Sequence, residues 1–129
     1  MKSSSKGGAS LDANALVRAI ENGESSAIDA ALAGRSALVS RLAVREFLVK
    51  GDKQALREFL SARGGRGAAS GSEASVGALQ DQASSLGRSL KLKDARVAAS
   101  AQREGVPVIT RDSKFSNFLN AVGIGGEKF

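Results

Sequence analysis

The chain has 129 residues, with 19 Lys and Arg against 13 Asp and Glu, so its formal net charge is +6. This length suits one domain with one core, and the charge favours a polyanionic partner such as RNA or DNA, the alternative being an idle basic surface. Cys and His are both absent, which excludes disulfides, thiolate metal sites and imidazole chemistry. Any catalysis must therefore use carboxylates, hydroxyls, Lys or Arg, with or without a metal. No apolar run approaches the ~18 residues of a membrane span, so we expect no membrane partner.

The first ten residues, Met1–Ser10, are rich in Lys, Ser and Gly and show no hydrophobic period. They predict a flexible leader or linker at residues 1–10, with the folded domain at residues 11–129. Apolar residues at helical spacing then predict short helices over residues 12–22 and 25–33. Ala37–Ser40 is short and apolar enough to predict a strand.

The middle of the chain is predominantly helical in pattern. Helices are predicted over Leu42–Val49 and Asp52–Arg63, followed by a flexible loop over Gly64–Ser72, which is rich in Gly and Ser. A weaker helical pattern extends from Ser72 to about Leu90, and a clearer one covers Lys91–Glu104.

Val106–Thr110 is apolar or β-branched apart from Pro107, which typifies a strand buried in a parallel sheet. Proline is tolerated near the start of such a strand. A helical pattern opens at Ser113, Ala121–Ile124 predicts a last strand, and Gly125–Phe129 predicts a tail. Helices that alternate with a few short strands indicate an α/β fold with a small parallel sheet flanked by helices.

Four carboxylates border apolar segments: Asp12, Glu46, Asp94 and Asp112. Each has a structural explanation, such as capping a helix or complementing a helix dipole. If instead they gather at one end of a sheet, their charges repel, and the cluster must hold protons or bind cations. Oxygen ligands without His or Cys select Mg²⁺ or Mn²⁺.

Four segments resemble the acidic motifs of the PIN domain, in the order of that family: LDANALV, LAVREFL, LKDARVAAS and VPVITRDSKF. Asp12 and Asn14 are similar to the opening motif, and Thr110-Arg111-Asp112 is the most specific match. The resemblance implies a single three-layer, Rossmann-like α/β domain. The family includes metal-dependent ribonucleases, many of them toxins of bacterial toxin–antitoxin pairs.

The resemblance also implies roles for individual residues. The four acids would be catalytic and would bind Mg²⁺ or Mn²⁺, or would orient metal-bound water. Three side chains would support them by hydrogen bonds: Asn14, Ser40 and Thr110. Four basic residues beside the acids could contact phosphate, or could be ordinary surface charge: Arg45, Arg96, Arg111 and Lys114.

The leading hypothesis is thus a metal-dependent endoribonuclease, a bacterial toxin that cuts tRNA, rRNA or mRNA in the cytoplasm. An antitoxin or immunity protein is the expected partner, and a homodimer is left open. The leader suggests that the domain could be delivered as part of a larger secreted toxin. One alternative is a non-catalytic nucleic-acid-binding module on the same fold, and another is an interaction domain whose acids are caps and ion-pair partners. A deoxyribonuclease is a variant of the first hypothesis.

Overall fold

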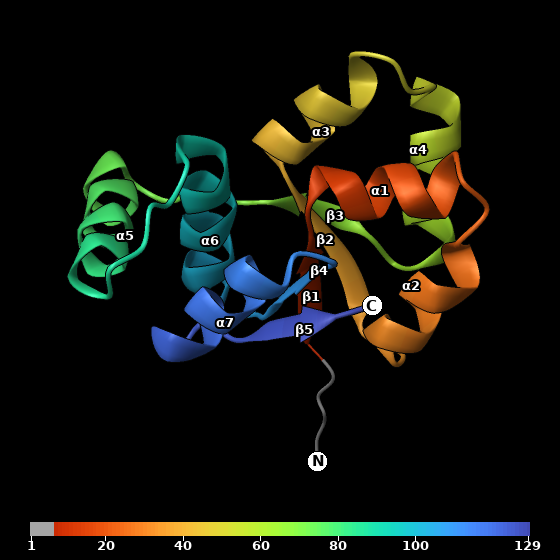
Figure 1. Cartoon of the computed structure of the whole chain (residues 1–129). Helices are drawn as coiled ribbons and strands as arrows, with labels where there is room; N and C mark the ends of the chain where they lie inside the picture. The colour runs from red at the N-terminus through yellow and green to blue at the C-terminus, as the bar shows by residue number, and fades with distance from the viewer. Residues whose placement is uncertain (1–6) are drawn as a thin grey trace.

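The computed structural model describes residues 7–129, within which a five-stranded parallel sheet is covered by helices on both faces (Figure 1). The strands are β1 (Gly8–Leu11), β2 (Ser36–Ser40), β3 (Arg66–Ala68), β4 (Val108–Thr110) and β5 (Gly126–Lys128). The helices are α1 (Ala13–Ile20), α2 (Ser25–Leu32), α3 (Arg41–Leu48), α4 (Lys53–Ala62), α5 (Glu73–Ser85), α6 (Leu92–Glu104) and α7 (Ser113–Ala121). The strand order is β3-β2-β1-β4-β5, and every pairing is parallel. The predicted α/β class with a parallel sheet flanked by helices is confirmed.

The two faces of the sheet carry separate cores. Helices α1 to α4 cover one face and α5 to α7 cover the other (Figure 1). Alternation along β2 supplies both cores, because Ala37 and Val39 face the first group of helices and Leu38 faces the second. Between residues 7 and 129, no helix is both long and apolar enough to cross a membrane.

Side-chain caps set where most of the helices begin. A Ser or Asp side chain accepts a hydrogen bond from a backbone N–H in the first turn of five helices: Asp12 at α1, Ser40 at α3, Asp52 at α4, Ser72 at α5 and Asp112 at α7. Such caps satisfy N–H groups that have no partner within the helix. Because this signal is local in sequence, the predicted helix starts agree closely with the structure.

Strand β1 corrects the predicted boundary of the leader. Gly8, Ala9 and Ser10 were expected in a flexible segment, but they form a buried central strand that pairs with β2 and β4. Their small size suits this position, because a Cβ on Gly8 would lie 3.1 Å from the Ser36 carbonyl oxygen and closer still to Leu38. Residues 1–6 of the predicted leader lie outside the described part of the chain.

Two further strands lie where the sequence predicted irregular backbone. Strand β3 interrupts the predicted loop over Gly64–Ser72 and pairs with β2. The last strand was predicted at Ala121–Ile124, but β5 forms instead from Gly126–Lys128, within the predicted tail. Both are edge strands of three residues, and they exist because a neighbouring strand offers hydrogen bonds, not because of their own hydrophobic pattern.

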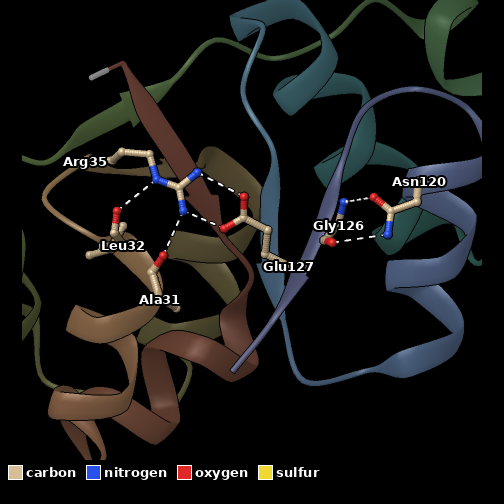
Figure 2. Close-up of polar contacts among 6 residues, drawn as sticks. All are labelled: Ala31, Leu32, Arg35, Asn120, Gly126 and Glu127. Carbon is tan, nitrogen blue, oxygen red and sulfur yellow. Dashed lines mark hydrogen bonds and ion pairs between the residues drawn. The ribbon is translucent and has the colours of Figure 1, made fainter. Parts of the chain in front are cut away.

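Polar contacts hold β5 against the rest of the domain (Figure 2). The Arg35 guanidinium donates to two carbonyls at the end of α2 and also bonds both carboxylate oxygens of Glu127. On the other side, the Asn120 amide donates to the Gly126 carbonyl and accepts from its N–H, at 3.2 and 2.8 Å. The chain end is therefore an integral edge of the sheet.

A second ion pair joins Arg66 of β3 to Glu104 of α6 and shifts the pKa of the Glu104 carboxyl group. Both guanidinium Nη atoms donate to the Glu104 carboxylate, at 2.8 and 3.2 Å, and the Ala69 N–H donates to it at 2.7 Å. These hydrogen bonds to the ionised form lower the pKa of Glu104 to about 2.

We predict that Glu104→Gln destabilises the fold in a pH-dependent way. Because the folded-state pKa lies below the unfolded value, the stabilisation is fully present above about pH 4.5 and is lost as pH falls towards about 2. At pH 7 the variant should lose roughly 1 kcal/mol of unfolding free energy, since solvent screens the exposed Arg66. Urea denaturation at several pH values measures this. The exposed Glu21→Gln is the matched control, and a deficit that stays constant down to about pH 2 would contradict the assignment.

Candidate active site at the carboxyl edge of the sheet

The site lies where the strand order reverses, between β1 and β4. Leu11 and Ile109 are register partners, so the residues that follow them, Asp12 and Thr110, lie side by side at the carboxyl ends of these strands. Thr110 Oγ1 donates to Asp12 Oδ2 at 2.8 Å and accepts the Asp112 N–H at 3.2 Å. Open α/β sheets bind ligands at such switch points. One buried hydroxyl thus connects two of the predicted acids.

Asp12 caps helix α1, and its surroundings disfavour the ionised form of its carboxyl group. Its Oδ1 accepts the Ala15 N–H at 2.8 Å, which begins α1. Burial nevertheless raises the pKa of Asp12, and the nearby charges of Asp112 and Glu46 raise it further, while the bonds from Ala15 and Thr110 oppose the shift. Asp12 therefore serves as a helix cap and is at the same time a candidate residue of the site.

Asp94 and Asp112 lie at the starts of two helices that meet this edge. Asp112 Oδ1 accepts the N–H groups of Lys114 and Phe115 and so caps α7. Asp94 is in the first turn of α6, and its pKa is raised first by burial and then by the charge of Asp112. Weaker effects of Asp12 and Glu46 add to that shift, and Lys91 opposes it. The four acids thus influence one another electrostatically, from four different elements.

Glu46 differs from the other three acids because it has a cationic partner. Lys93 Nζ lies 2.8 Å from Glu46 Oε2, which joins α3 to the first turn of α6. Among residues 7–129, no group of three or more acidic side chains is arranged closely enough to hold a metal ion. The Lys93 ammonium therefore compensates the charge of Glu46, the fourth of the predicted acids.

The donor set nevertheless suits a divalent cation by its chemistry. All of the charged groups that it offers to a cation are carboxylates, which Mg²⁺ and Mn²⁺ prefer. Asp12 and Asp94 have raised pKa values, so their ionised forms are disfavoured, and a cation beside them would relieve both burial and repulsion.

A cleft of about 670 Å³ opens beside these acids, between α7 and the segment that joins α5 to α6. We call it the main cleft. Asp94 and Asp112 line it, together with three basic side chains: Arg88, Lys91 and Lys114. Lys114 is one of the phosphate contacts predicted from the sequence, and that role stays a prediction; Arg88 and Lys91 were not among those predicted. The basic run from Arg88 to Lys93 was the available signal, but its relation to Asp112 appears only in the fold.

The other residues that the sequence predicted to support the acids or to contact phosphate lie in different parts of the structure. Asn14 is exposed in the first turn of α1, and buried Ser40 caps α3 by accepting the Ala43 N–H at 3.1 Å. Arg111 is held at 2.7 Å by Glu24 and lies 4.7 Å over the Phe129 ring, so the protein itself engages its guanidinium. The other two predicted phosphate contacts lie outside the main cleft, in a second hollow: Arg45 and Arg96.

The fold and this edge define a class of protein: a parallel α/β domain that gathers carboxylates around its topological switch point. The PIN domain family matches residues 9–118, and the chain belongs to that family. No curated protein matches it.

Solved structures with the same fold are distant in sequence. The chain is 18% identical to a chain of VapBC2 from Rickettsia felis bound to a promoter DNA fragment, with a TM-score of 0.69 and coverage of 93% of this chain and 97% of that one. It is also 18% identical to a chain of FitAcB from Neisseria gonorrhoeae, with a TM-score of 0.63 and coverage of 92% and 95%. A toxin–antitoxin complex from Klebsiella pneumoniae is 24% identical, with a TM-score of 0.58 and coverage of 82% and 88%. At these identities the likeness shows the fold.

Proposed function

We propose that this protein is a metal-dependent endoribonuclease that hydrolyses phosphodiester bonds in RNA. The observation that carries the proposal is the juxtaposition of mutually repelling carboxylates with basic residues in one cleft. Asp94 and Asp112 line the main cleft beside Arg88, Lys91 and Lys114, and the pKa of Asp94 is raised by burial and by Asp112. Membership of the PIN domain family supports the same chemistry. Metal-binding acids combined with phosphate-binding cations are the groups that phosphodiester cleavage requires.

Each group then has a role. Asp12, Asp94 and Asp112, with Glu46 once it is released from Lys93, would hold Mg²⁺ or Mn²⁺. When bound, such an ion lowers the pKa of water and neutralises charge that develops on the phosphate. The Thr110 hydroxyl, which donates to Oδ2, would orient the Asp12 carboxylate and opposes the rise in its pKa.

The basic residues of the main cleft would bind the substrate. Arg88, Lys91 and Lys114 would hold the RNA backbone by its phosphates, which positions the strand without reading its bases.

We further propose that the protein is a toxin neutralised by a small antitoxin or immunity protein, and that it acts on cytoplasmic RNA. The support is that similar folds occur in FitAcB, in VapBC2 and in a toxin–antitoxin complex. Expression of the chain should arrest bacterial growth, and a small partner protein that co-purifies with the chain should restore growth when the two are co-expressed. Growth that stays normal at high levels of folded protein would contradict the toxin assignment.

The Glu46–Lys93 ion pair favours a second candidate, a non-catalytic nucleic-acid-binding module. With Lys93 at Glu46, one carboxylate is already neutralised without a metal. Such a module would bind RNA or DNA in a salt-sensitive way that is indifferent to chelators.

Removal of the metal separates these candidates. Purified protein incubated with total RNA should give discrete products with Mg²⁺ or Mn²⁺, no products with EDTA, and products again when excess metal is restored. The physical reason is that carboxylates are themselves negatively charged, so without a metal ion they cannot neutralise the charge of the phosphate. Gel analysis of the RNA measures the outcome. Cleavage that persists in EDTA would contradict the metal assignment, and intact RNA with both metals and folded protein would favour the binding module.

A further inference from the structure

A second hollow, of about 300 Å³, lies at the carboxyl ends of β2 and β3. We call it the arginine hollow, because three arginines line it: Arg41, Arg45 and Arg96. Three serines contribute to the same lining: Ser40, Ser70 and Ser100. Leu42 and Val76 are its larger apolar side chains, so the lining combines guanidinium and hydroxyl groups with apolar surface.

The charge of this hollow is poorly compensated within the chain. No carboxylate is among its lining residues. Arg41 and Arg45 take part in no salt bridge within residues 7–129. Arg96 does pair with Glu73 at 3.1 Å, but their side chains are 42% and 76% exposed, so an anionic ligand can displace this contact at little cost.

Helix α6 contributes to the lining of both the arginine hollow and the main cleft. Helix α6 presents Asp94 to the main cleft and Arg96 to the arginine hollow. Helix α3 carries Arg45 directly before Glu46, which is paired with Lys93 of α6. Two of the arginines that line the hollow are therefore carried by the same helices as two of the predicted acids, Glu46 and Asp94.

We propose that the arginine hollow binds a backbone phosphate of the same RNA strand whose scissile region occupies the main cleft. This inference rests on the proposed ribonuclease function and extends it to a second phosphate subsite. A guanidinium group is planar and can form two parallel hydrogen bonds to phosphate oxygens. The arginine hollow offers three such groups beside three serine hydroxyls. A lining with three guanidinium groups and no carboxylate favours an anionic ligand.

Binding by a catalytically silent protein tests the subsite without depending on cleavage. We would measure fluorescence anisotropy of a single-stranded RNA of about 15 nucleotides, within the site sizes of single-strand-binding proteins, on an Asp94→Asn background. In that background, Arg41→Ala with Arg45→Ala should weaken binding about tenfold. It should also lower the slope of log affinity against log salt by about 0.7, because one phosphate contact to a single strand is lost.

Two comparisons make the result specific. Arg57→Ala is the matched control, since Arg57 is an exposed arginine on α4 outside both clefts, and it should leave affinity and slope unchanged. Replacing Arg41 and Arg45 by Lys should restore the slope but only part of the affinity, because an ammonium lacks the fork geometry. Thermal unfolding checks that each variant is folded.

The outcomes distinguish the two proposals. If wild-type protein cuts RNA but the double alanine variant binds RNA as Arg57→Ala does, the subsite is overturned and the nuclease stands. If the double variant loses only the co-purifying partner protein while its RNA binding is intact, the hollow is a protein contact and the subsite is likewise overturned. If no variant binds RNA and the wild type does not cut it, both proposals are overturned.

Discussion

Replacing Asp94 by Asn is expected to reduce RNA cleavage by at least about 100-fold and to raise the thermal stability of the protein. The loss of activity follows because the amide keeps the shape of the carboxylate but removes a negative charge from the proposed metal site. The gain in stability follows from the raised pKa of Asp94, caused by burial and then by the charge of Asp112. A folded-state pKa above the unfolded value means that ionisation at neutral pH costs folding free energy.

The pH dependence of the wild type should agree with this result. As pH rises through the raised pKa values of Asp94 and Asp12, stability should decrease and cation binding should increase. As the pH is lowered, activity should therefore begin to fall at a higher pH than it would if these aspartates had ordinary pKa values. Initial rates and unfolding temperatures, measured across the same buffers, check both trends.

The matched control is Asp81→Asn, which removes an exposed carboxylate on α5 outside the main cleft. It should leave cleavage unchanged. An Asp94→Asn protein that is folded and still cuts at the wild-type rate would remove Asp94 from the site. If that variant were inactive but also clearly less stable, the proposed repulsion among the acids would be wrong.

Replacing Thr110 by Val is expected to impair both the fold and the site. Thr110 is 1% exposed, and its hydroxyl donates to Asp12 and accepts the Asp112 N–H. Valine fills the same volume but leaves both of these groups without a partner, which should cost about 1–3 kcal/mol of unfolding free energy. Because the hydroxyl also orients a proposed metal ligand, activity should fall about 10- to 100-fold.

The pH profile separates a specific role of the hydroxyl from general destabilisation. The Thr110 hydrogen bond lowers the pKa of Asp12, so its loss should raise that pKa further and move the acid limb of the rate profile to higher pH. Thr110→Ser keeps the hydroxyl and should restore most of the activity and the original profile. A Thr110→Val protein with lower activity but an unmoved acid limb would show that the hydroxyl does not act through Asp12.

Helix starts were predictable because the signals that produce them are close together in the chain. Asp52 and Ser72 cap helices whose first turns follow immediately, so periodicity and cap residue were read from one short window. Strands β1, β3 and β5 were not predictable in this way. Gly8–Leu11, Arg66–Ala68 and Gly126–Lys128 have no strong strand pattern, and each becomes a strand because another strand offers it a parallel partner.

The sequence by itself determined the chemical inventory: no imidazole or thiol, an excess of positive charge, and four carboxylates next to apolar segments. Those features depend on composition and local pattern, which folding does not change. Only the tertiary structure decided how this inventory is arranged. It joins Thr110 to Asp12 across 98 residues, pairs Lys93 with Glu46, engages Arg111 with Glu24, and brings Arg88 and Lys91 beside Asp112. Such contacts depend on strand order and helix packing, in which residues far apart in the chain become neighbours, and no local pattern specifies them.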